Sequence, residues 1–263
     1  MSDAGNQSSM PPLMPEDYRW LQSPTDPSLW RRRAIGTENM VGIQPKNIRG
    51  QYDLFFSSTV EFYNNGLTLA SLEQKIQKAL LHLRFQHPEV AHTVSWDKTG
   101  VIWIQSQVTN EQEQLNAWAR STVAVEKSDR SAEDICDAIE KQRRVESPVE
   151  ARSVTIFVAA PVDSMESVLG NTTIQFLFHV NHLYFDGISI RLLVGDLFRA
   201  LGAQLSGNNN SSAKSGPDNL PPPVLDILRQ DQGISGSEYE TGLDTFMKST
   251  ARGMVSVNPC LQS

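Results

Sequence analysis

Alternating apolar and polar positions, rich in β-branched and aromatic residues, predict strands in the middle of the chain. The first of them ends at Asn64-Asn65-Gly66, which is a turn signal. Asp97-Lys98-Thr99-Gly100 separates the second and third and fits a hairpin turn. The predicted strands cover residues 54–62, 90–96, 101–108, 154–162 and 172–180.

Helical periodicity appears in three segments between and after these strands. The first helix should begin at Thr68 or Ser71, which both suit a cap, and end at His87-Pro88, because the residue before proline avoids the helical region. Further helices are predicted at residues 131–145 and 187–205. The apolar face of the first helix is formed by Leu69, Leu72, Ile76, Leu80 and Leu83. That of the last is broad and includes Ile188, Leu192, Leu193, Leu197, Phe198 and Leu201.

The predicted strand before His182 is apolar on both faces, with Phe176 and Phe178 on one and Leu177 on the other. Such a strand is expected to be covered on both sides. The periodicity weakens at both ends of the chain. We therefore predict a flexible N-terminus at residues 1–25, a folded lobe at 26–205, a linker at 206–223, and an incomplete, poorly structured C-terminal segment at 224–263, with possible short helices at 224–230 and 243–252.

Composition narrows the class of protein. The chain has 263 residues, 39% of them hydrophobic, and no apolar run of the roughly 20 residues that span a bilayer. Its N-terminus has no secretory signal pattern, and Cys136 and Cys260 form neither a disulfide framework nor a metal knuckle, so the cytoplasm is expected. A net charge of -7 disfavours general nucleic-acid binding. Arg31-Arg32-Arg33 fits a solvated patch better than a phosphate or membrane contact.

The candidate chemistry lies at His182, Asp186 and Gly187, where the last predicted strand gives way to a helix. Histidine exchanges protons near neutrality because its ordinary pKa is about 6.5. His182 is therefore a candidate general base that deprotonates a hydroxyl or amine during attack on an acyl donor. Asp186 would orient His182 or brace the turn, and Gly187 would allow a close approach or a positive φ angle.

Three other interpretations compete with this one. His179, His182 and Asp186 could bind a metal, but three-residue spacing on a strand points the two histidines to opposite faces, and a fourth ligand is not evident, so no metal is expected. Ser189 could be a nucleophile, but it lacks the G-x-S-x-G elbow. His182 and Asp186 could also simply hydrogen-bond a turn.

The segment His182-Leu-Tyr-Phe-Asp186-Gly187 resembles the HxxxDG signature of the CoA-dependent acyltransferase superfamily, and the order of predicted elements over residues 16–205 is similar to its N-terminal lobe. Asn181 in place of a second histidine resembles the fungal secondary-metabolite acetyltransferases. The resemblance implies an α/β fold (an α+β sandwich), with one chloramphenicol acetyltransferase-like lobe whose mixed sheet is covered by helices. It also implies that His182 is the base in direct transfer from an acyl-CoA co-substrate to an alcohol, with Asp186 and Gly187 supporting the site.

Complete members of that superfamily have two similar lobes with a tunnel between them, and the plant branch has a DFGWG motif that this chain lacks. We therefore expect a truncated member, with an exposed apolar face that favours self-association or a completing lobe. The expected partners are an alcohol acceptor and acyl-CoA, without nucleic acid or membrane span. The alternative is a non-catalytic lobe that binds a small molecule or a partner protein.

Overall fold

The computed structural model describes residues 18–35, 38–39, 53–63, 66–98, 100–127, 130–145, 152–161, 172–207, 216–222 and 241. The predicted C-terminal helices lie outside these residues. The chain divides into one unit of residues 19–221 and another of residues 1–18 and 222–263, and only the first is described in detail. Its elements are β1 (Leu21–Gln22), β2 (Leu29–Arg33), β3 (Asp53–Phe62), α2 (Leu69–Gln86), η2 (Pro88–Ala91), β4 (His92–Trp96), β5 (Ile102–Gln107), α3 (Gln112–Thr122), β6 (Val123–Lys127), α4 (Ala132–Val145), β7 (Val154–Ala160), β8 (Thr172–Asn181), α5 (Ser189–Leu205) and η4 (Pro217–Asn219).

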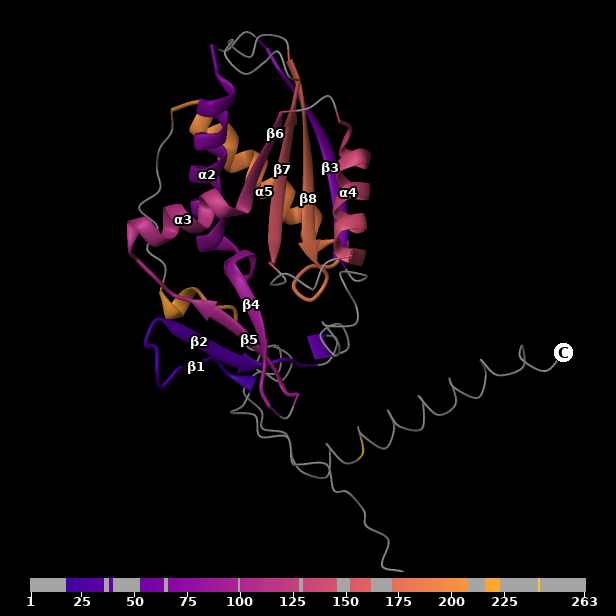
Figure 1. Cartoon of the computed structure of the whole chain (residues 1–263). Coiled ribbons are helices and arrows are strands. Elements are labelled where there is room, and N and C mark those ends of the chain that lie inside the picture. The colour runs from indigo at the N-terminus through magenta and orange to yellow at the C-terminus, as the bar shows by residue number, and fades with distance from the viewer. Residues whose placement is uncertain are drawn as a thin grey trace, which may run out of the picture. The chain divides into compact units, whose positions relative to one another are not determined.

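The larger sheet has the strand order β3-β8-β7-β6 (Figure 1). Strand β8 pairs antiparallel with both β3 and β7, while β6 pairs parallel with β7, so the sheet is mixed. The pairing with β3 runs over ten residues, from Asp53 opposite Asn181 to Phe62 opposite Thr172. Strand β8 is thereby hydrogen-bonded on both edges, which gives its C-terminal end a fixed position.

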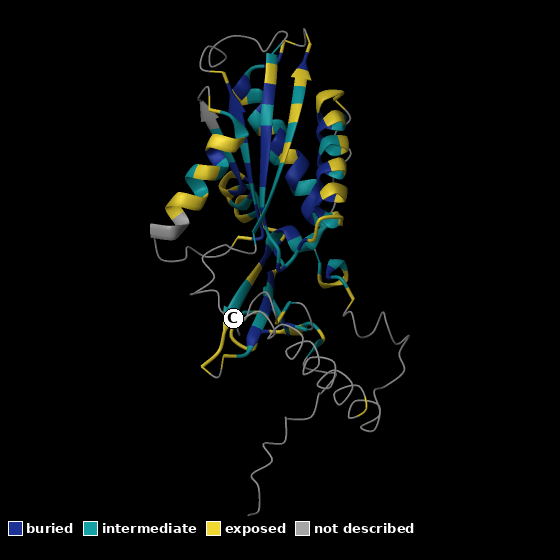
Figure 2. Ribbon diagram, turned by 90° about the vertical axis from the view of Figure 1, so that its right-hand side faces the viewer, coloured by how far each residue is buried: buried dark blue, intermediate teal, exposed yellow. Residues whose placement is uncertain are grey.

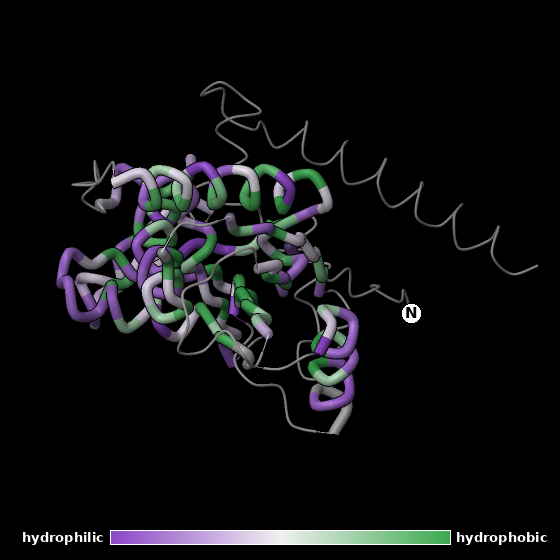
Figure 3. Tube along the Cα trace, turned by 90° about the horizontal axis from the view of Figure 1, so that it is seen from above, coloured by the Kyte–Doolittle hydropathy of each residue, from purple (hydrophilic) through white to green (hydrophobic). Residues whose placement is uncertain are grey.

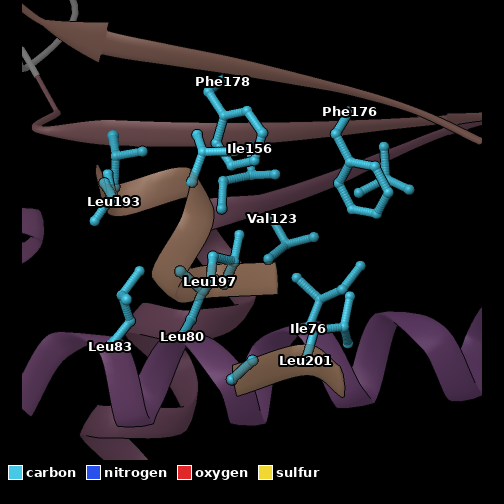
Figure 4. Close-up of a cluster of buried hydrophobic side chains, with 14 of the residues drawn as sticks. Ile76, Leu80, Leu83, Val123, Ile156, Phe176, Phe178, Leu193, Leu197 and Leu201 are labelled. Carbon is cyan, nitrogen blue, oxygen red and sulfur yellow. The ribbon is translucent and has the colours of Figure 1, made fainter. Parts of the chain in front are cut away.

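Helices cover both faces of this sheet. Phe176 and Phe178 of β8 point toward α2 and α5, where they pack among leucines such as Leu80 and Leu197 (Figure 4). Leu177 points the other way and packs against Ile135 of α4. Buried residues run along the strands and the sheet-facing sides of the helices in Figure 2, and hydrophilic and hydrophobic residues alternate along the helices in Figure 3. The two apolar faces of β8 are therefore covered as its sequence predicted.

The smaller sheet is antiparallel, in the order β1-β2-β5-β4. Its inner face carries Ile102 and Ile104 of β5, which pack with Ala34 and with Leu183 of the signature segment. Because strand residues alternate between faces, Arg32 points inward and is buried, whereas Arg31 and Arg33 lie over the Trp103 ring at 4.8 and 5.8 Å. The three consecutive arginines are thus not one solvated patch.

The fold class and most elements agree with the sequence-based prediction. Thr68 caps α2 by accepting a hydrogen bond from the Ser71 N–H at 3.2 Å, which decides between the two candidate caps. Strands β2 and β6 and helix α3 were not predicted, and β1 and η4 were expected to lie in a flexible N-terminus and a linker. Both instead belong to the folded unit: β1 pairs with β2, and Trp20 Nε1 donates to the Pro221 carbonyl at 3.0 Å. None of the described helices is long and apolar enough to cross a membrane.

Candidate active site

The signature turn begins at Asn181, the last residue of β8. Its N–H donates to the Ser153 carbonyl at 3.0 Å, beside β7. Its side-chain Oδ1 accepts from the Leu183 N–H at 2.8 Å, and its carbonyl accepts from the Tyr184 N–H at 3.1 Å. Asparagine is suited to this role because its short amide closes a turn on the backbone two residues ahead. Asn181 stood out in the sequence only as the replacement of a second histidine, whereas its side chain in fact holds the turn that contains His182.

The three residues between His182 and Asp186 anchor the turn to two apolar clusters. Leu183 is buried against the inner face of the smaller sheet, and Phe185 is buried in the main core. Tyr184 packs against both clusters. Since fully burying a leucine or phenylalanine contributes about 1.5–3 kcal/mol, the turn is well fixed on both sides.

His182 lies in this turn, directly after the end of β8. Its side chain is half-buried, and no other described residue hydrogen-bonds to its ring. A ring held by the backbone of an anchored turn but without a side-chain partner is available to a ligand. A half-buried imidazole of this kind is a candidate for a general base.

Asp186 and Ser189 form the start of α5. The Asp186 carboxylate accepts from the Ser189 N–H at 2.7 Å and from its hydroxyl at 2.8 Å, while Ser189 Oγ accepts from the Asp186 N–H at 2.7 Å. The Asp186 carbonyl accepts the first intrahelical bond, from Ile190, as an N-cap residue does. The Asp186-x-x-Ser189 spacing could have been recognised in the sequence as a capping pair.

These bonds determine the electrostatics of Asp186. Its pKa is lowered, first by the Ser189 backbone N–H and hydroxyl, and further by the Ile188 N–H and by the charge on His182 when protonated. Among the described residues, no arginine forms an ion pair with Asp186. The partners of the Asp186 carboxylate in this part of the chain are therefore those at the helix start.

Gly187 does not show the backbone features that the sequence analysis proposed. Its φ angle is not positive, unlike those of Gly66, Gly100 and Gly207. A Cβ atom added at Gly187 would meet nothing within 4 Å among the described residues. The left-handed conformation proposed for the glycine is therefore wrong, and no described residue approaches it closely.

His179 lies on the α4 side of the sheet. Its Nε2 pairs with Asp53 Oδ2 at 2.7 Å, and its ring stacks on Phe55 with the centroids 4.7 Å apart. Within the described residues, no group of three or more His, Cys, Asp or Glu side chains is placed to hold a metal ion. An open cavity of about 540 Å³ also lies on this side, and it includes no residue of the signature; its lining comprises Arg130, Asp134, Asp137, Ala138 and Lys141.

The matching sequence family agrees with this geometry. The profile described as 15-O-acetyltransferase Tri3 matches residues 10–259. The chain belongs to this family. Membership in the Tri3 family confirms the resemblance to CoA-dependent acyltransferases that the signature and the order of elements indicated.

Individual relatives support membership in the Tri3 family. The chain is 34% identical over 247 residues to the trichothecene 15-O-acetyltransferase TRI3 of Fusarium sporotrichioides, which covers 90% of this chain and 48% of that protein. It is also 34% identical to the trichothecene O-acetyltransferase TRI3 of Trichoderma arundinaceum, over 91% of this chain and 48% of that protein. The solved structure of the Fusarium enzyme superposes with a TM-score of 0.79 at 32% identity, covering 92% of this chain and 49% of that one. The chain thus spans about half the length of these relatives.

Proposed function

We propose that this chain is the N-terminal lobe of an acyl-CoA-dependent O-acetyltransferase that acts on an alcohol of a secondary metabolite, with His182 as the general base. The observation that carries the proposal is the His182 ring, which has no hydrogen-bond partner among the described residues although its turn is anchored on both sides. Because the relatives are named trichothecene O-acetyltransferases, a trichothecene hydroxyl is the proposed acceptor.

In the proposed reaction, His182 takes the proton of the hydroxyl as its oxygen attacks the carbonyl carbon of the acetyl thioester. The ester C–O bond forms, the C–S bond breaks, and the departing CoA sulfur receives the proton from His182. Acetyl-CoA is a co-substrate, and no covalent enzyme intermediate forms. Proton transfer by a positioned base contributes roughly 10²- to 10⁴-fold to the rate.

Asp186 has a supporting role in this scheme. Its carboxylate oxygen Oδ1 accepts three hydrogen bonds from Ile188 and Ser189, so it is committed to the helix start. We propose that Asp186 braces the turn and adds a negative charge near His182, without taking part in proton transfer.

The proposed partners are the alcohol and acyl-CoA, both small molecules. The net charge of -7 makes nucleic acid an unsuitable partner. The proposed compartment is the cytoplasm, because the sequence has two cysteines, far apart, and they form no disulfide framework.

A second candidate is a non-catalytic lobe that binds a small molecule or a partner protein. It is favoured by Ile188 and Leu192, which follow the signature and are exposed. A lobe without the second wall of the tunnel would lose much of the positioning that accelerates acyl transfer.

An acetylation assay separates the two candidates. The purified chain is mixed with acetyl-CoA and a trichothecene bearing a free 15-hydroxyl, and free CoA is measured with a thiol reagent while the ester is identified by mass spectrometry. The proposed enzyme releases CoA, and His182→Gln abolishes the release. The control His87→Gln, at another partly exposed histidine, retains activity. A wild type that is folded by circular dichroism but as inert as His182→Gln supports the non-catalytic lobe.

A further inference from the structure

Tyr184 and His92 each bury a polar atom that has no hydrogen-bond partner among the described residues. The atoms are the Tyr184 hydroxyl oxygen and His92 Nε2. Tyr184 is the central residue of the signature turn, and His92 is the first residue of β4 in the smaller sheet. Their rings are neighbours, 6.1 Å apart in an edge-to-face orientation. Buried polar groups in native proteins almost always have a hydrogen-bond partner. Two such groups without a partner on neighbouring rings therefore suggest a single cause.

The surroundings assign complementary roles to the two groups. Burial lowers the pKa of His92 to about 3, assisted by the charges of Arg32 and Arg84, so the ring is neutral at physiological pH. A neutral imidazole has one nitrogen that accepts a hydrogen bond. Burial also raises the pKa of Tyr184, which keeps its hydroxyl a donor. A buried donor and a buried acceptor therefore lie on neighbouring rings.

The residues around the two rings are held by other contacts. The Trp20 ring lies 5.1 Å from the His92 ring, and the Arg32 guanidinium lies 5.2 Å from the Trp20 ring. Arg32 makes a bidentate ion pair with Glu38 at 2.6 and 2.7 Å. Because the Arg32 guanidinium is hydrogen-bonded to Glu38, it is not the partner of the Tyr184 hydroxyl or of His92 Nε2.

We infer that one water molecule bridges the two groups, accepting from the Tyr184 hydroxyl and donating to His92 Nε2, and that this bridge positions the turn that holds His182. Leu183 and Phe185 fix the two sides of the turn by apolar contact, which is non-directional. Water-mediated hydrogen bonding between Tyr184 and His92 of the smaller sheet adds a directional contact that orients the turn. Tyr184 and His92 are then positioning residues, and the inference rests on the proposed function only for the catalytic consequence.

A double-mutant cycle tests the bridge itself. Tyr184→Phe and His92→Phe each leave the other polar atom buried and unpaired, so each should raise the unfolding equilibrium constant about fivefold to tenfold. The double variant removes both polar atoms and should be less destabilised than the product of the two single effects. Tyr63→Phe, at an exposed tyrosine, is the control. In the double variant of Tyr63→Phe and His92→Phe, the change in the unfolding equilibrium constant should equal the product of the two single changes. Independent effects of Tyr184→Phe and His92→Phe would overturn the inference.

Histidine NMR tests the positioning. The chain has five histidines, so the ring resonance of His182 can be assigned with His182→Gln and followed through a pH titration. Tyr184→Phe should change the chemical shift or titration midpoint of His182, whereas Tyr63→Phe should change neither. If His182 is unchanged in Tyr184→Phe, the positioning role is refuted. If the cycle shows coupling but the wild type transfers no acetyl group, the proposed function fails while the water bridge stands.

Discussion

Asp186 and Ser189 cap each other at the start of α5, with the Asp186 carboxylate 2.7 Å from the Ser189 nitrogen and Ser189 Oγ 2.7 Å from the Asp186 nitrogen. The pair joins the proposed catalytic turn to a helix that packs in the main core. An aspartate in this position accepts hydrogen bonds from first-turn N–H groups that have no partner within the helix. Its negative charge also interacts favourably with the positive end of the helix dipole. The acidic residue of the signature is therefore explained by helix geometry within this lobe.

Asp186→Ala should destabilise the chain by about 1 kcal/mol, because it removes an N-cap side chain, while Asp186→Asn should lose less. Since the folded-state pKa of Asp186 is lowered, the contribution of its charge is present above the ordinary pKa of about 3.8 and is lost as the pH falls through the lowered value. Urea unfolding at pH 7 and pH 3 measures both effects.

The matched control for this variant is Asp134→Ala. Asp134 forms a similar reciprocal pair with Ser131 at the start of α4, on the other side of the sheet. Asp134→Ala should cost similar stability without changing acetyl transfer, whereas Asp186→Ala should reduce transfer as well. Equal activities of the two variants would contradict a bracing role for Asp186.

His87 gives the fold a pH-dependent contact between α2 and α5. Its Nε2 pairs with Asp196 at 2.8 Å, and its Nδ1 lies 3.3 Å from Glu89. The Glu89 carboxylate is the main cause that raises the pKa of His87 above 6.5, and Asp196 adds to it. A raised folded-state pKa stabilises the fold fully below the unfolded value and loses that effect as the pH rises through the folded value. The free energy of unfolding should therefore differ more between wild type and His87→Gln at pH 5.5 than at pH 8.5.

Urea titrations of both proteins at the two pH values check this expectation. Asp196→Asn should weaken the same pH dependence, because Asp196 remains ionised throughout that range in the wild type. The control is His82→Gln, elsewhere on α2, which should keep the pH dependence that His87 gives to the free energy of unfolding. A pH-independent difference between wild type and His87→Gln would refute the ion pair as its source.

Gly187→Ala should leave stability within about 1 kcal/mol of the wild type. The φ angle is not in the left-handed region and the added Cβ has open space, so the substitution reduces the entropy of the unfolded chain without strain. Thermal unfolding measures the effect. If stability is kept while acetyl transfer is lost, the glycine is needed for a ligand or for chain beyond the described residues. A loss of several kcal/mol would contradict the local geometry.

The sequence predicted the elements whose pattern is local and missed those that depend on distant partners. Helix α2 and strand β8 have clear periodicity, and both were found. Helix α3 is mostly polar, with Ala119 and Thr122 as its buried residues, and β6 follows it without a turn signal. Strand β2 was missed because Arg31 and Arg33 lie over the ring of Trp103, which is far away in the sequence.

The candidate site shows the same division. His182, Asp186 and Gly187 could be singled out from their spacing, and the apolar strand before them indicated where they lie. The approach of His92 to Tyr184 could not be predicted, because it requires the smaller sheet to be placed under the turn. The exposure of Ile188 and Leu192 also departed from the sequence-based helix face, since the buried stripe of α5 runs instead through Ile190, Leu193, Val194, Leu197 and Leu201.

Ile188, directly before α5, and Leu192 in its first turn are 72% and 62% exposed and should promote association of the chain. Replacing both with serine removes the apolar surface without disturbing the buried stripe, so the fraction of dimers and larger species should fall. Sedimentation velocity across a concentration series measures that fraction. Leu205→Ser, at a less exposed leucine near the other end of α5, is the control and should leave it unchanged. Equal association of the double variant and the wild type would show that other surfaces hold the copies together, because the exposed side chains of Ile188 and Leu192 would then contribute nothing to association.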